Sequence, residues 1–260
     1  MQEFSQSARE KAERYLSQCR EYTNPDEGER LIADWTTKRT EAENVVGDFK
    51  RRAGEVAGKL ILDVGCGNGT FMAAFARASA EVSGLEVNQT LVDIAKDTLK
   101  DEDVRGEVFF YDGITFPFPN NSFDYAFSVS TLEHVSDPRR ILSEIHRVLK
   151  PGGKLYLAFP NRWRPLETHT GVLFLSYVPR SLAHFILQTF WRRNSVDELN
   201  LHFLSYWSLK RFLHGIPLQI LPEYDATTGI RSLIKRILGF FGIHFSAILG
   251  TVMVVLEKRK

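Results

Sequence analysis

The sequence predicts an α/β fold, built on a parallel β-sheet with helices on both faces. From Lys59 to about residue 159, short apolar runs alternate with helical stretches, and the glycine-rich stretch GCGNG at 65–69 joins the first run directly to a helix. Alternation of this kind is typical of βα units, whose connecting helices cover the two faces of a parallel sheet. We therefore expect about five strands between residues 59 and 159.

The helix before the fifth strand has the clearest boundaries. Ser136-Asp137-Pro138 combines a capping residue with a proline in the first turn, and Pro151-Gly152-Gly153 is predicted to end the helix. The expected strands are KLILDV (59–64), EVSGLEV (81–87), GEVFFYD (106–112), FDYAFSV (123–129) and GKLYLAF (153–159). The expected helices are TFMAAFARA (70–78), TLVDIAKDTL (90–99) and DPRRILSEIHRVLK (137–150).

Residues 1–55 are expected to form an N-terminal helical lid of two helices. Asn24-Pro25-Asp26 ends the first helix and starts the second. An apolar stripe along the second helix needs a surface to pack on, which we expect to be the main domain, so that the pair acts as a lid or brace. The stripe consists of Leu31, Trp35, Ala42, Val45 and Phe49.

The main domain is expected to cover 56–260. The long aromatic and basic stretch at about 160–205 interrupts the alternation and is interpreted as an insertion that caps the substrate site. It is followed by a helix, SYWSLKRFLHG (205–215), and by strands LQILPEY (218–224) and GTVMVVLEK (250–258). Residues 237–256 contain no Asp, Glu, Lys or Arg, so a transmembrane helix is an alternative there, although three glycines and a β-branched end favour a buried strand.

Composition narrows the functional classes. The 260 residues, 43% of them hydrophobic, are enough for the core of one domain, and a net charge of +1 gives no basic field for nucleic acid. Cys19 and Cys66 are far apart in sequence, and the charged N-terminus lacks the apolar core of a secretory signal. We expect a cytoplasmic protein without a nucleic-acid partner; the oligomeric state is left open.

The glycine-rich turn predicts a ligand site. A strand that ends in Asp63 and turns through Gly65, Cys66, Gly67 and Gly69 into a helix presents backbone N–H groups with few side chains in the way. The spacing is GxGxG, and Thr70 stands where a dinucleotide-binding GxGxxG turn has its third glycine. This spacing weakens the case for a nicotinamide dehydrogenase.

Acidic residues end the next two predicted strands. Glu86, followed by Val87, is placed to accept hydrogen bonds from two ribose hydroxyls, and Asp112, followed by Gly113, to accept one from an adenine amino group. A solvated surface carboxylate is the alternative for Glu86, and a simple Asp-Gly turn is the alternative for Asp112. Together with the glycines, these residues mark one crevice at the carboxyl edge of the sheet.

At this point the chain resembles the class I S-adenosylmethionine-dependent methyltransferases. The matching stretches are LILDVGCGNGTF (60–71), GLEVN (84–88), YDG (111–113), FDYAFSVSTLEHV (123–135) and LKPGGKLYL (149–157). The resemblance implies a Rossmann-like, seven-stranded doubly wound sheet whose last strand is antiparallel. It also implies S-adenosylmethionine as cofactor and S-adenosylhomocysteine as product, with Asp63, Gly65 and Gly67 around the methionine part. Glu86 would bind the ribose, Asp112 would lie near the adenine, and the backbone around Val129 near the sulfonium.

Methyl transfer from a sulfonium needs nucleophile, methyl and sulfur in line and water excluded, and an oxygen acceptor also needs a base. His134 and His169 are the candidates for that base; each has the alternative of a structural loop histidine. The LEHV stretch also resembles quinone-biosynthesis O-methyltransferases, in which an acidic residue three positions before the Glu-His pair helps to bind a metal. Ser130 stands at that position, so we predict no metal site.

The leading hypothesis is methyl transfer to a small-molecule or lipid-linked acceptor, with oxygen as the favoured acceptor atom. The insertion would shape the acceptor pocket, and its aromatics beside Arg162, Arg164, Arg192 and Arg193 also suit peripheral contact with lipid headgroups. Lys38 or Arg39 would neutralise the cofactor carboxylate. The alternatives are a non-catalytic S-adenosylmethionine-binding protein, a nicotinamide dehydrogenase and a membrane-anchored protein.

Overall fold

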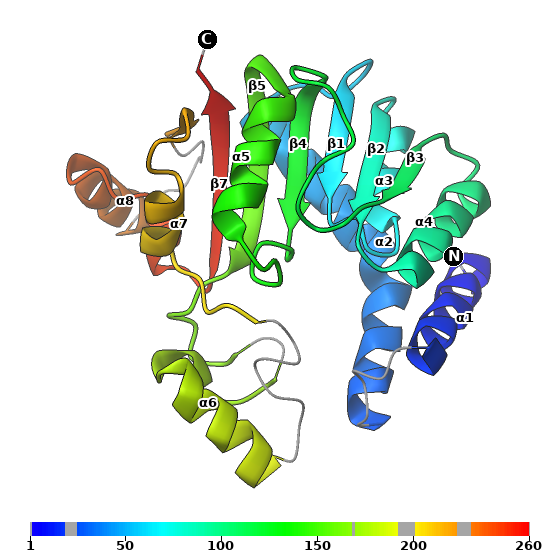
Figure 1. Cartoon of the computed structure of the whole chain (residues 1–260), viewed down its shortest axis with the longest axis horizontal. Helices are drawn as coiled ribbons and strands as arrows, with labels where there is room; N and C mark the ends of the chain where they lie inside the picture. The colour runs from blue at the N-terminus through cyan, green and yellow to red at the C-terminus, as the bar shows by residue number, and fades with distance from the viewer. Residues whose placement is uncertain (1, 19–24, 168–169, 192–200, 223–229, 260) are drawn as a thin grey trace. The chain divides into compact units, whose positions relative to one another are not determined.

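The computed structural model describes residues 2–18, 25–167, 170–191, 201–222 and 230–259 (Figure 1). The chain divides into two compact units, Met1–Lys50 with Gly54–Gly113, and Arg51–Ala53 with Ile114–Lys260. Its strands form a seven-stranded sheet in the order β3-β2-β1-β4-β5-β7-β6. The predicted α/β class with an antiparallel last strand is therefore confirmed.

The first unit holds three parallel strands. Leu60 pairs with Glu81 and Ser83 pairs with Glu107, so the carboxyl ends of the strands lie at the same edge. The strands are β1 (Leu60–Val64), β2 (Glu81–Glu86) and β3 (Glu107–Phe110), and the helices between them are α3 (Thr70–Arg77) and α4 (Gln89–Asp101). Four of the five residues of β1 are buried, as expected of a central strand that helices cover on both sides.

Two N-terminal helices, α1 (Gln2–Gln18) and α2 (Pro25–Ala53), confirm the sequence prediction, and α2 begins at the expected proline. They pack with α4 around a cluster of Ala12, Tyr15, Trp35 and Ile94. Two ion pairs join α1 to α4: Lys11 Nζ lies 2.7 Å from Asp101 Oδ2, and Arg14 NH2 lies 2.8 Å from Asp97 Oδ2. The helices brace α4 within this unit, and their role as a lid stays a prediction.

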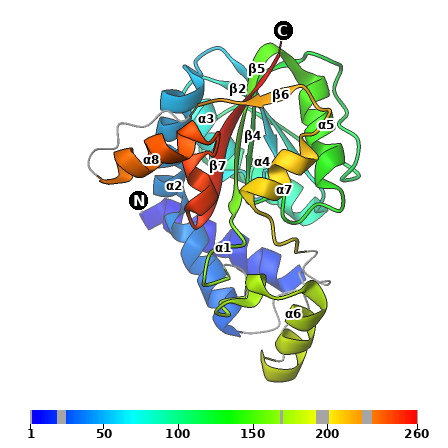
Figure 2. The same cartoon turned by 90° about the vertical axis from the view of Figure 1, so that its left-hand side faces the viewer.

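The second unit contains β4 (Phe123–Val129), β5 (Leu149–Pro160), β6 (Leu218–Ile220) and β7 (Thr251–Lys258). β4 and β5 are parallel, whereas β7 runs antiparallel to both β5 and β6. In Figure 2, α5 (Pro138–Val148) and α7 (Tyr206–Phe212) lie to one side of β7 and α8 (Ile230–Phe240) lies to the other. Helices therefore flank both faces of this part of the sheet.

One predicted boundary is wrong. The start of α5 is confirmed, since the Asp137 side chain accepts the Arg140 N–H at 3.0 Å. Its end is not at Pro151-Gly152-Gly153, because the helix stops at Val148 and β5 begins at once. The pairing of β4 with β5 jumps from Leu149 opposite Phe123 to Lys154 opposite Tyr125, so the Pro-Gly-Gly turn lies inside a bulge of β5.

The insertion after β5 forms a small core of its own, made of Val172, Leu175, Ala183, Leu187 and Leu201. Its described elements are η1 (Leu175–Tyr177), α6 (Arg180–Ile186) and η2 (Leu187–Trp191). Arg192 and Arg193 lie outside the described residues.

The apolar stretch 237–256 is not one helix, so the transmembrane alternative is wrong for it. It comprises the last turn of α8, the short helix η3 (Phe245–Ile248) and most of β7. Across the described parts of the chain, no helix has both the length and the apolar character needed to span a bilayer.

Candidate functional site

The loop after β1 is held against β2 by backbone hydrogen bonds. The N–H groups of Gly65 and Cys66 both donate to the carbonyl of Leu85, at 2.9 and 3.0 Å. At Gly67 a side chain would meet nothing within 4 Å, so the backbone there is open on its outer side. Gly69 is closed instead, since a Cβ atom would lie 2.9 Å from Cα of Ala95 in α4. The loop is thus fixed from within and free where a ligand could lie against it.

Glu86 joins this loop to the end of β2. Its carboxylate accepts the N–H of Gly67 at 3.0 Å, of Val87 at 2.9 Å and of Asn88 at 3.1 Å. Burial raises the pKa of the carboxyl, and the three backbone N–H groups oppose that rise. A carboxylate has about four acceptor positions, so about one remains for a ligand hydroxyl. The structure thus places Glu86 and Gly67 together; the ribose role of Glu86 stays a prediction.

Asp63 and Cys66 lie beneath the loop. Asp63 is 2% exposed, and its Oδ2 is a buried oxygen without a hydrogen-bond partner among the described residues. Burial, and then the charge of Glu86, raises the pKa of Asp63 to about 8. The Cys66 thiol is buried as well, and burial raises its pKa. An orphaned buried carboxylate oxygen is costly, which favours a ligand that supplies a donor or a positive charge near it.

The edge of β2 and β3 exposes apolar surface. Val87 is 52% and Phe110 55% exposed, and a Cβ at Gly113 would lie 3.4 Å from Cγ1 of Val87. Asp112 is exposed, and its charge contributes, after burial and Glu86, to raising the pKa of Tyr111. Exposed apolar side chains beside an acid at this edge fit a flat heteroaromatic ring with an amino group. Phe110 was not predicted as a site residue, although its place at the end of a strand was a usable signal.

In the second unit, β4 ends at Val129 and the chain turns through Ser130, whose φ is +55°. The Ser130 N–H donates to Ala158 of β5 at 2.9 Å, and the His134 N–H donates to the Thr131 carbonyl at the same distance. The His134 side chain is half-buried in this turn. His169 lies outside the described residues. Positive φ in a residue other than glycine marks a turn that the surrounding structure holds in place.

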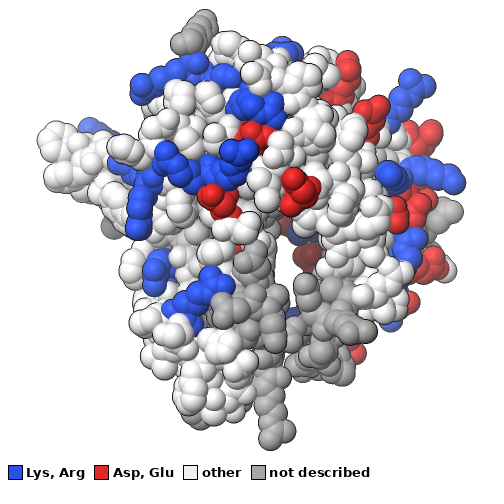
Figure 3. Space-filling view, in the orientation of Figure 1, with Lys and Arg blue, Asp and Glu red and all other residues white. Residues whose placement is uncertain are grey.

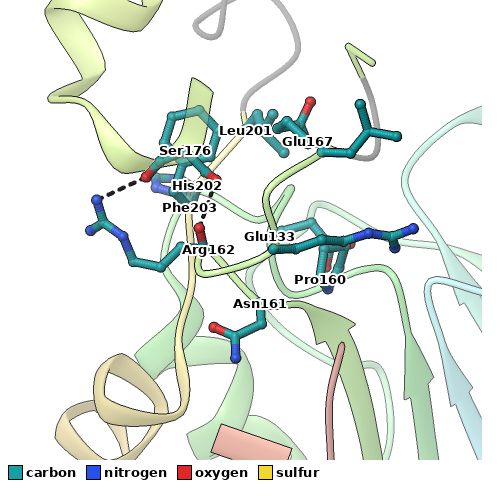
Figure 4. Close-up of a pocket in the computed structure, with 11 residues that line it drawn as sticks. Glu133, Pro160, Asn161, Arg162, Glu167, Ser176, Leu201, His202 and Phe203 are labelled. Carbon is teal, nitrogen blue, oxygen red and sulfur yellow. Dashed lines mark hydrogen bonds between the residues drawn. The ribbon is translucent and has the colours of Figure 1, made fainter. Parts of the chain in front are cut away.

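A polar pocket lies beyond the carboxyl ends of β4 and β5 (Figure 4). Glu133 is 1% exposed there, and the backbone N–H of His202 donates to its carbonyl at 2.7 Å. The enclosed space is about 20 Å³, enough for one water molecule. The lining residues are Glu133, Pro160, Asn161, Arg162, Arg164, Leu166, Glu167, Ser176, Leu201, His202 and Phe203.

Arg162 and Ser176 lock one wall of this pocket. Arg162 NH2 donates to the Ser176 carbonyl at 2.9 Å, and Ser176 Oγ donates to the Arg162 carbonyl at 2.6 Å. Arg162 Nε is buried and has no hydrogen-bond partner among the described residues. Burial and Arg180 lower the pKa of His202, against an opposing contribution from the Val135 backbone. Asn161, Glu133 and His202 were missed as site residues, because residues far apart in sequence form the pocket.

Two further sequence predictions concern cations and metals. Arg39 lies 3.3 Å from Glu102, which also pairs with Arg77, so it is engaged away from the glycine-rich loop. Lys38 Nζ lies 5.6 Å from the ring centroid of Phe71 in the first turn of α3, close to that loop. Within the described ranges, no group of three or more His, Cys, Asp or Glu side chains is arranged to hold a metal ion.

Comparisons with known proteins find a methyltransferase domain and methyltransferase relatives. Residues 62–157 match the model of a methyltransferase domain. Over 105 residues the chain is 34% identical to a ubiquinone biosynthesis O-methyltransferase of Coxiella burnetii. The aligned residues make up 40% of this chain and 45% of that protein. Over 180 residues it is 27% identical to a ubiquinone/menaquinone biosynthesis C-methyltransferase of Cupriavidus metallidurans, covering 68% of this chain and 74% of that one.

A solved structure shows the same fold. A S-adenosylmethionine-dependent methyltransferase from Aquifex aeolicus aligns with a TM-score of 0.55 and 17% identity, over 84% of this chain and 89% of that one. The chain spans about half the length of the curated O-methyltransferases that it matches. The glycine turn, Glu86 and the sheet order agree with these matches. Residues 62–157 therefore belong to a methyltransferase domain, and the chain has the fold of S-adenosylmethionine-dependent methyltransferases.

Proposed function

We propose that the protein transfers a methyl group from S-adenosylmethionine to a small-molecule or lipid-linked acceptor, at an oxygen atom. The names of the relatives support this class of acceptor, since two of them act in quinone biosynthesis and one of these is an O-methyltransferase. Those matches cover about half of the O-methyltransferase, so the acceptor is inferred from the residues of this chain as well.

The first unit would hold the cofactor. Its residues fit the group: Gly67 leaves open space beside its backbone, Asp63 presents an orphaned buried oxygen, and Glu86 keeps an acceptor position. Asp63 and the backbone of Gly65 to Gly69 would bind the methionine part, and Glu86 would bind the ribose. When bound, S-adenosylmethionine supplies a methyl group activated by a sulfonium.

The same unit offers surface for the adenine ring. Val87 and Phe110 expose apolar area, and Asp112 with Gly113 supplies an acceptor for the amino group. The backbone around Val129, in the second unit, is assigned to the sulfonium end. Both cations considered for the cofactor carboxylate are ion-paired, Arg39 with Glu102 and Lys38 with Asp34 and Glu41. We retain Lys38 because it also lies over the ring of Phe71 in the first turn of α3.

The observation that carries the choice of acceptor is Arg162 Nε, a buried donor without a partner among the described residues, at the pocket beyond β4 and β5. With about 20 Å³ of space, the pocket would admit a single oxygen of the acceptor and not its whole body. A guanidinium donor fits an acceptor oxygen that is hydroxylic or anionic. A hydroxyl acceptor must lose its proton as the oxygen attacks, and His134 and His169 are our candidates for that base. The neighbouring carboxylate of Glu133 would orient the acceptor.

The test begins with calorimetric titration of the purified protein with S-adenosylmethionine and S-adenosylhomocysteine, with NADH as control. Binding of the first two, weakened in Glu86→Ala, supports the cofactor site. A screen of phenols, quinone precursors and lipid-linked sugars then follows product formation. Arg162→Gln is expected to raise KM for the acceptor, and His134→Gln to lower kcat with cofactor affinity unchanged.

Each outcome separates the alternatives. Binding of NADH in place of S-adenosylmethionine would contradict the proposal. Tight cofactor binding with no turnover of any oxygen, nitrogen or carbon acceptor would favour the non-catalytic binding protein. Unchanged turnover in His134→Gln would remove His134 from the list of bases, and the same holds for His169→Gln.

A further inference from the structure

Helix α8 carries an apolar face that the second unit leaves exposed. Three large side chains on it, Leu233, Ile237 and Phe240, are 51% to 85% exposed, and Phe241, directly after its end, is 68% exposed. They lie at positions i, i+4, i+7 and i+8, which is one face of a helix, and they line a shallow hollow together with Arg236. An exposed apolar face of this kind marks a binding surface more often than a solvated one.

The end of α8 holds the two phenylalanines outward. Gly242 adopts φ +65°, and the N–H groups of Gly242 and Ile243 donate to the carbonyls of Gly239 and Leu238 at 3.0 and 2.9 Å. This αL closure fixes the last turn of the helix. The rings of Phe240 and Phe241 pack edge to face with centroids 5.3 Å apart. Their exposure therefore follows from a defined helix end.

The same surface continues beyond the helix. α8 packs on η3, and the two residues at the end of that element, Ile248 and Leu249, are 56% and 40% exposed. Next to them, the side chain of Arg164 lies against Gly250, where a Cβ would be 3.5 Å from the Arg164 Cδ atom. The exposed side chains of Ile248 and Leu249 therefore also have an arginine, Arg164, beside them.

The charge around this face has one sign. α8 contains Arg231, Lys235 and Arg236; both arginines are exposed and Arg236 lines the hollow, whereas the Lys235 ammonium is buried. No Asp or Glu occurs from Ile230 to Leu256. Figure 3 shows the same pattern at its left, where the surface over α8 is uncharged or blue, without red. An exposed apolar helix face with arginine beside it is typical of helices that lie in the interface of an anionic membrane.

We propose that α8, with Phe240 and Phe241 at its tip, docks the protein on an anionic lipid surface. Charge decides between this occupant and a second copy of the chain. A two-fold contact through the apolar face of α8 would bring Arg236 of both copies to the same contact, whereas an anionic surface complements it. The helix lies on such a surface; at 11 residues it is too short to cross it.

The biological reason for docking rests on the proposed function, because docking would bring the methyl-transfer site to a lipid-linked acceptor. The docking itself does not depend on that function. Docking through α8 is also a different proposal from membrane contact through the insertion after β5. In the insertion, Leu182 and Phe185 of α6 are 45% and 56% exposed. Those two side chains provide a matched control, because they are apolar, exposed and helical.

The experiment is co-sedimentation of the purified chain with vesicles of phosphatidylcholine alone and of phosphatidylcholine mixed with phosphatidylglycerol. Binding to the mixed vesicles that weakens at high salt is expected. Phe240→Ser with Phe241→Ser should reduce the partition coefficient at least about tenfold, because two buried aromatic side chains are lost. Arg231→Gln with Arg236→Gln should reduce it about fivefold per charge at low salt and little at high salt.

Leu182→Ser with Phe185→Ser should leave the partition coefficient within about twofold, since the contact energy is assigned to α8. Unchanged thermal unfolding of each double variant shows that the fold is intact. Loss of vesicle binding in the α6 variant with full binding in the α8 variant would overturn the proposal. So would equal binding to both kinds of vesicle, or a dimer that the α8 variant dissociates while wild type ignores vesicles.

Failure of docking is distinguishable from failure of the proposed function. If wild type binds S-adenosylmethionine and ignores the mixed vesicles, only the docking is wrong. If it binds the vesicles through α8 and does not bind S-adenosylmethionine, only the proposed function is wrong.

Discussion

The Glu86 carboxylate accepts the Gly67 N–H at 3.0 Å, which ties the end of β2 to the glycine turn after β1. The same carboxylate accepts two more N–H groups from the start of the loop after β2. One buried acid therefore organises both loops to which the cofactor is assigned. Its removal is expected to act on loop geometry as well as on direct contact with the ribose.

Replacement of Glu86 tests this double role. Glu86→Ala leaves three N–H groups without their acceptor and is expected to weaken S-adenosylmethionine binding about 10- to 100-fold and to lower the melting temperature. Glu86→Gln keeps one acceptor oxygen, so its affinity for S-adenosylmethionine and its melting temperature should lie between those of wild type and Glu86→Ala. Asp93→Ala is the control, because Asp93 accepts a hydrogen bond from Gln89 on the exposed side of α4. Calorimetric affinities equal to wild type in Glu86→Ala would contradict the assignment.

Asp63 is expected to trade stability for binding. Its pKa in the folded protein is about 8, above the ordinary value of 3.8, so the folded state holds a proton that the unfolded state has lost. The contribution of Asp63 to stability should therefore fall as pH rises from about 4 to about 8. Asp63→Asn removes this loss, so the variant should be more stable than wild type above pH 8 and should bind S-adenosylmethionine more weakly.

Thermal unfolding across this pH range, with and without the cofactor, checks that prediction. An identical pH dependence in wild type and Asp63→Asn would show that burial of this carboxyl has no energetic consequence.

Two glycines with similar backbone angles separate strain from packing. Gly58 and Gly69 have φ of +66° and +78°, but a Cβ at Gly58 meets nothing within 4 Å, whereas one at Gly69 meets the Ala95 backbone. Gly58→Ala is expected to cost about 1–2 kcal/mol of unfolding free energy from backbone strain alone. Gly69→Ala should cost about 1–3 kcal/mol more, because α3 and α4 must separate. Denaturant titration measures both, and equal costs would refute the packing argument.

His244 is expected to make the free energy of unfolding sensitive to acid. Burial, then Arg52 and Lys235, lowers its pKa from 6.5 to about 4, and its Nδ1 accepts the Ser246 N–H at 3.3 Å. The folded state binds fewer protons than the unfolded state between these values. The contribution of His244 to stability should therefore fall as pH drops from about 6.5 to about 4, by about 2 kcal/mol after allowance for partial exposure.

His244→Asn keeps an acceptor for the Ser246 N–H and does not titrate, so its unfolding free energy should be flatter in this pH range. A slope as steep as that of wild type would assign the acid sensitivity to other groups.

The sequence was sufficient for those parts of the fold and site that local patterns determine. Strands β1 to β5 and the glycine turn follow from alternating apolar runs, and Glu86 follows from its place at a strand end. The end of α5 was misplaced, because Pro151-Gly152-Gly153 can end a helix or form a bulge, and only the pairing of β4 with β5 decides between them. Arg162, His202 and Glu133 come from three separate segments, and no local pattern brings them together.

The buried thiol of Cys66 can serve as a reporter of how often the glycine turn opens. In the folded state it is sealed under the glycine turn, where burial keeps it protonated and unreactive. In a Cys19→Ser background, the rate at which an alkylating reagent modifies Cys66 would report how often the turn lifts away from β2. A bound cofactor should lower this rate of modification. The native Cys66 thiol would therefore report how often the loop that is assigned to the cofactor opens, with no label introduced beforehand.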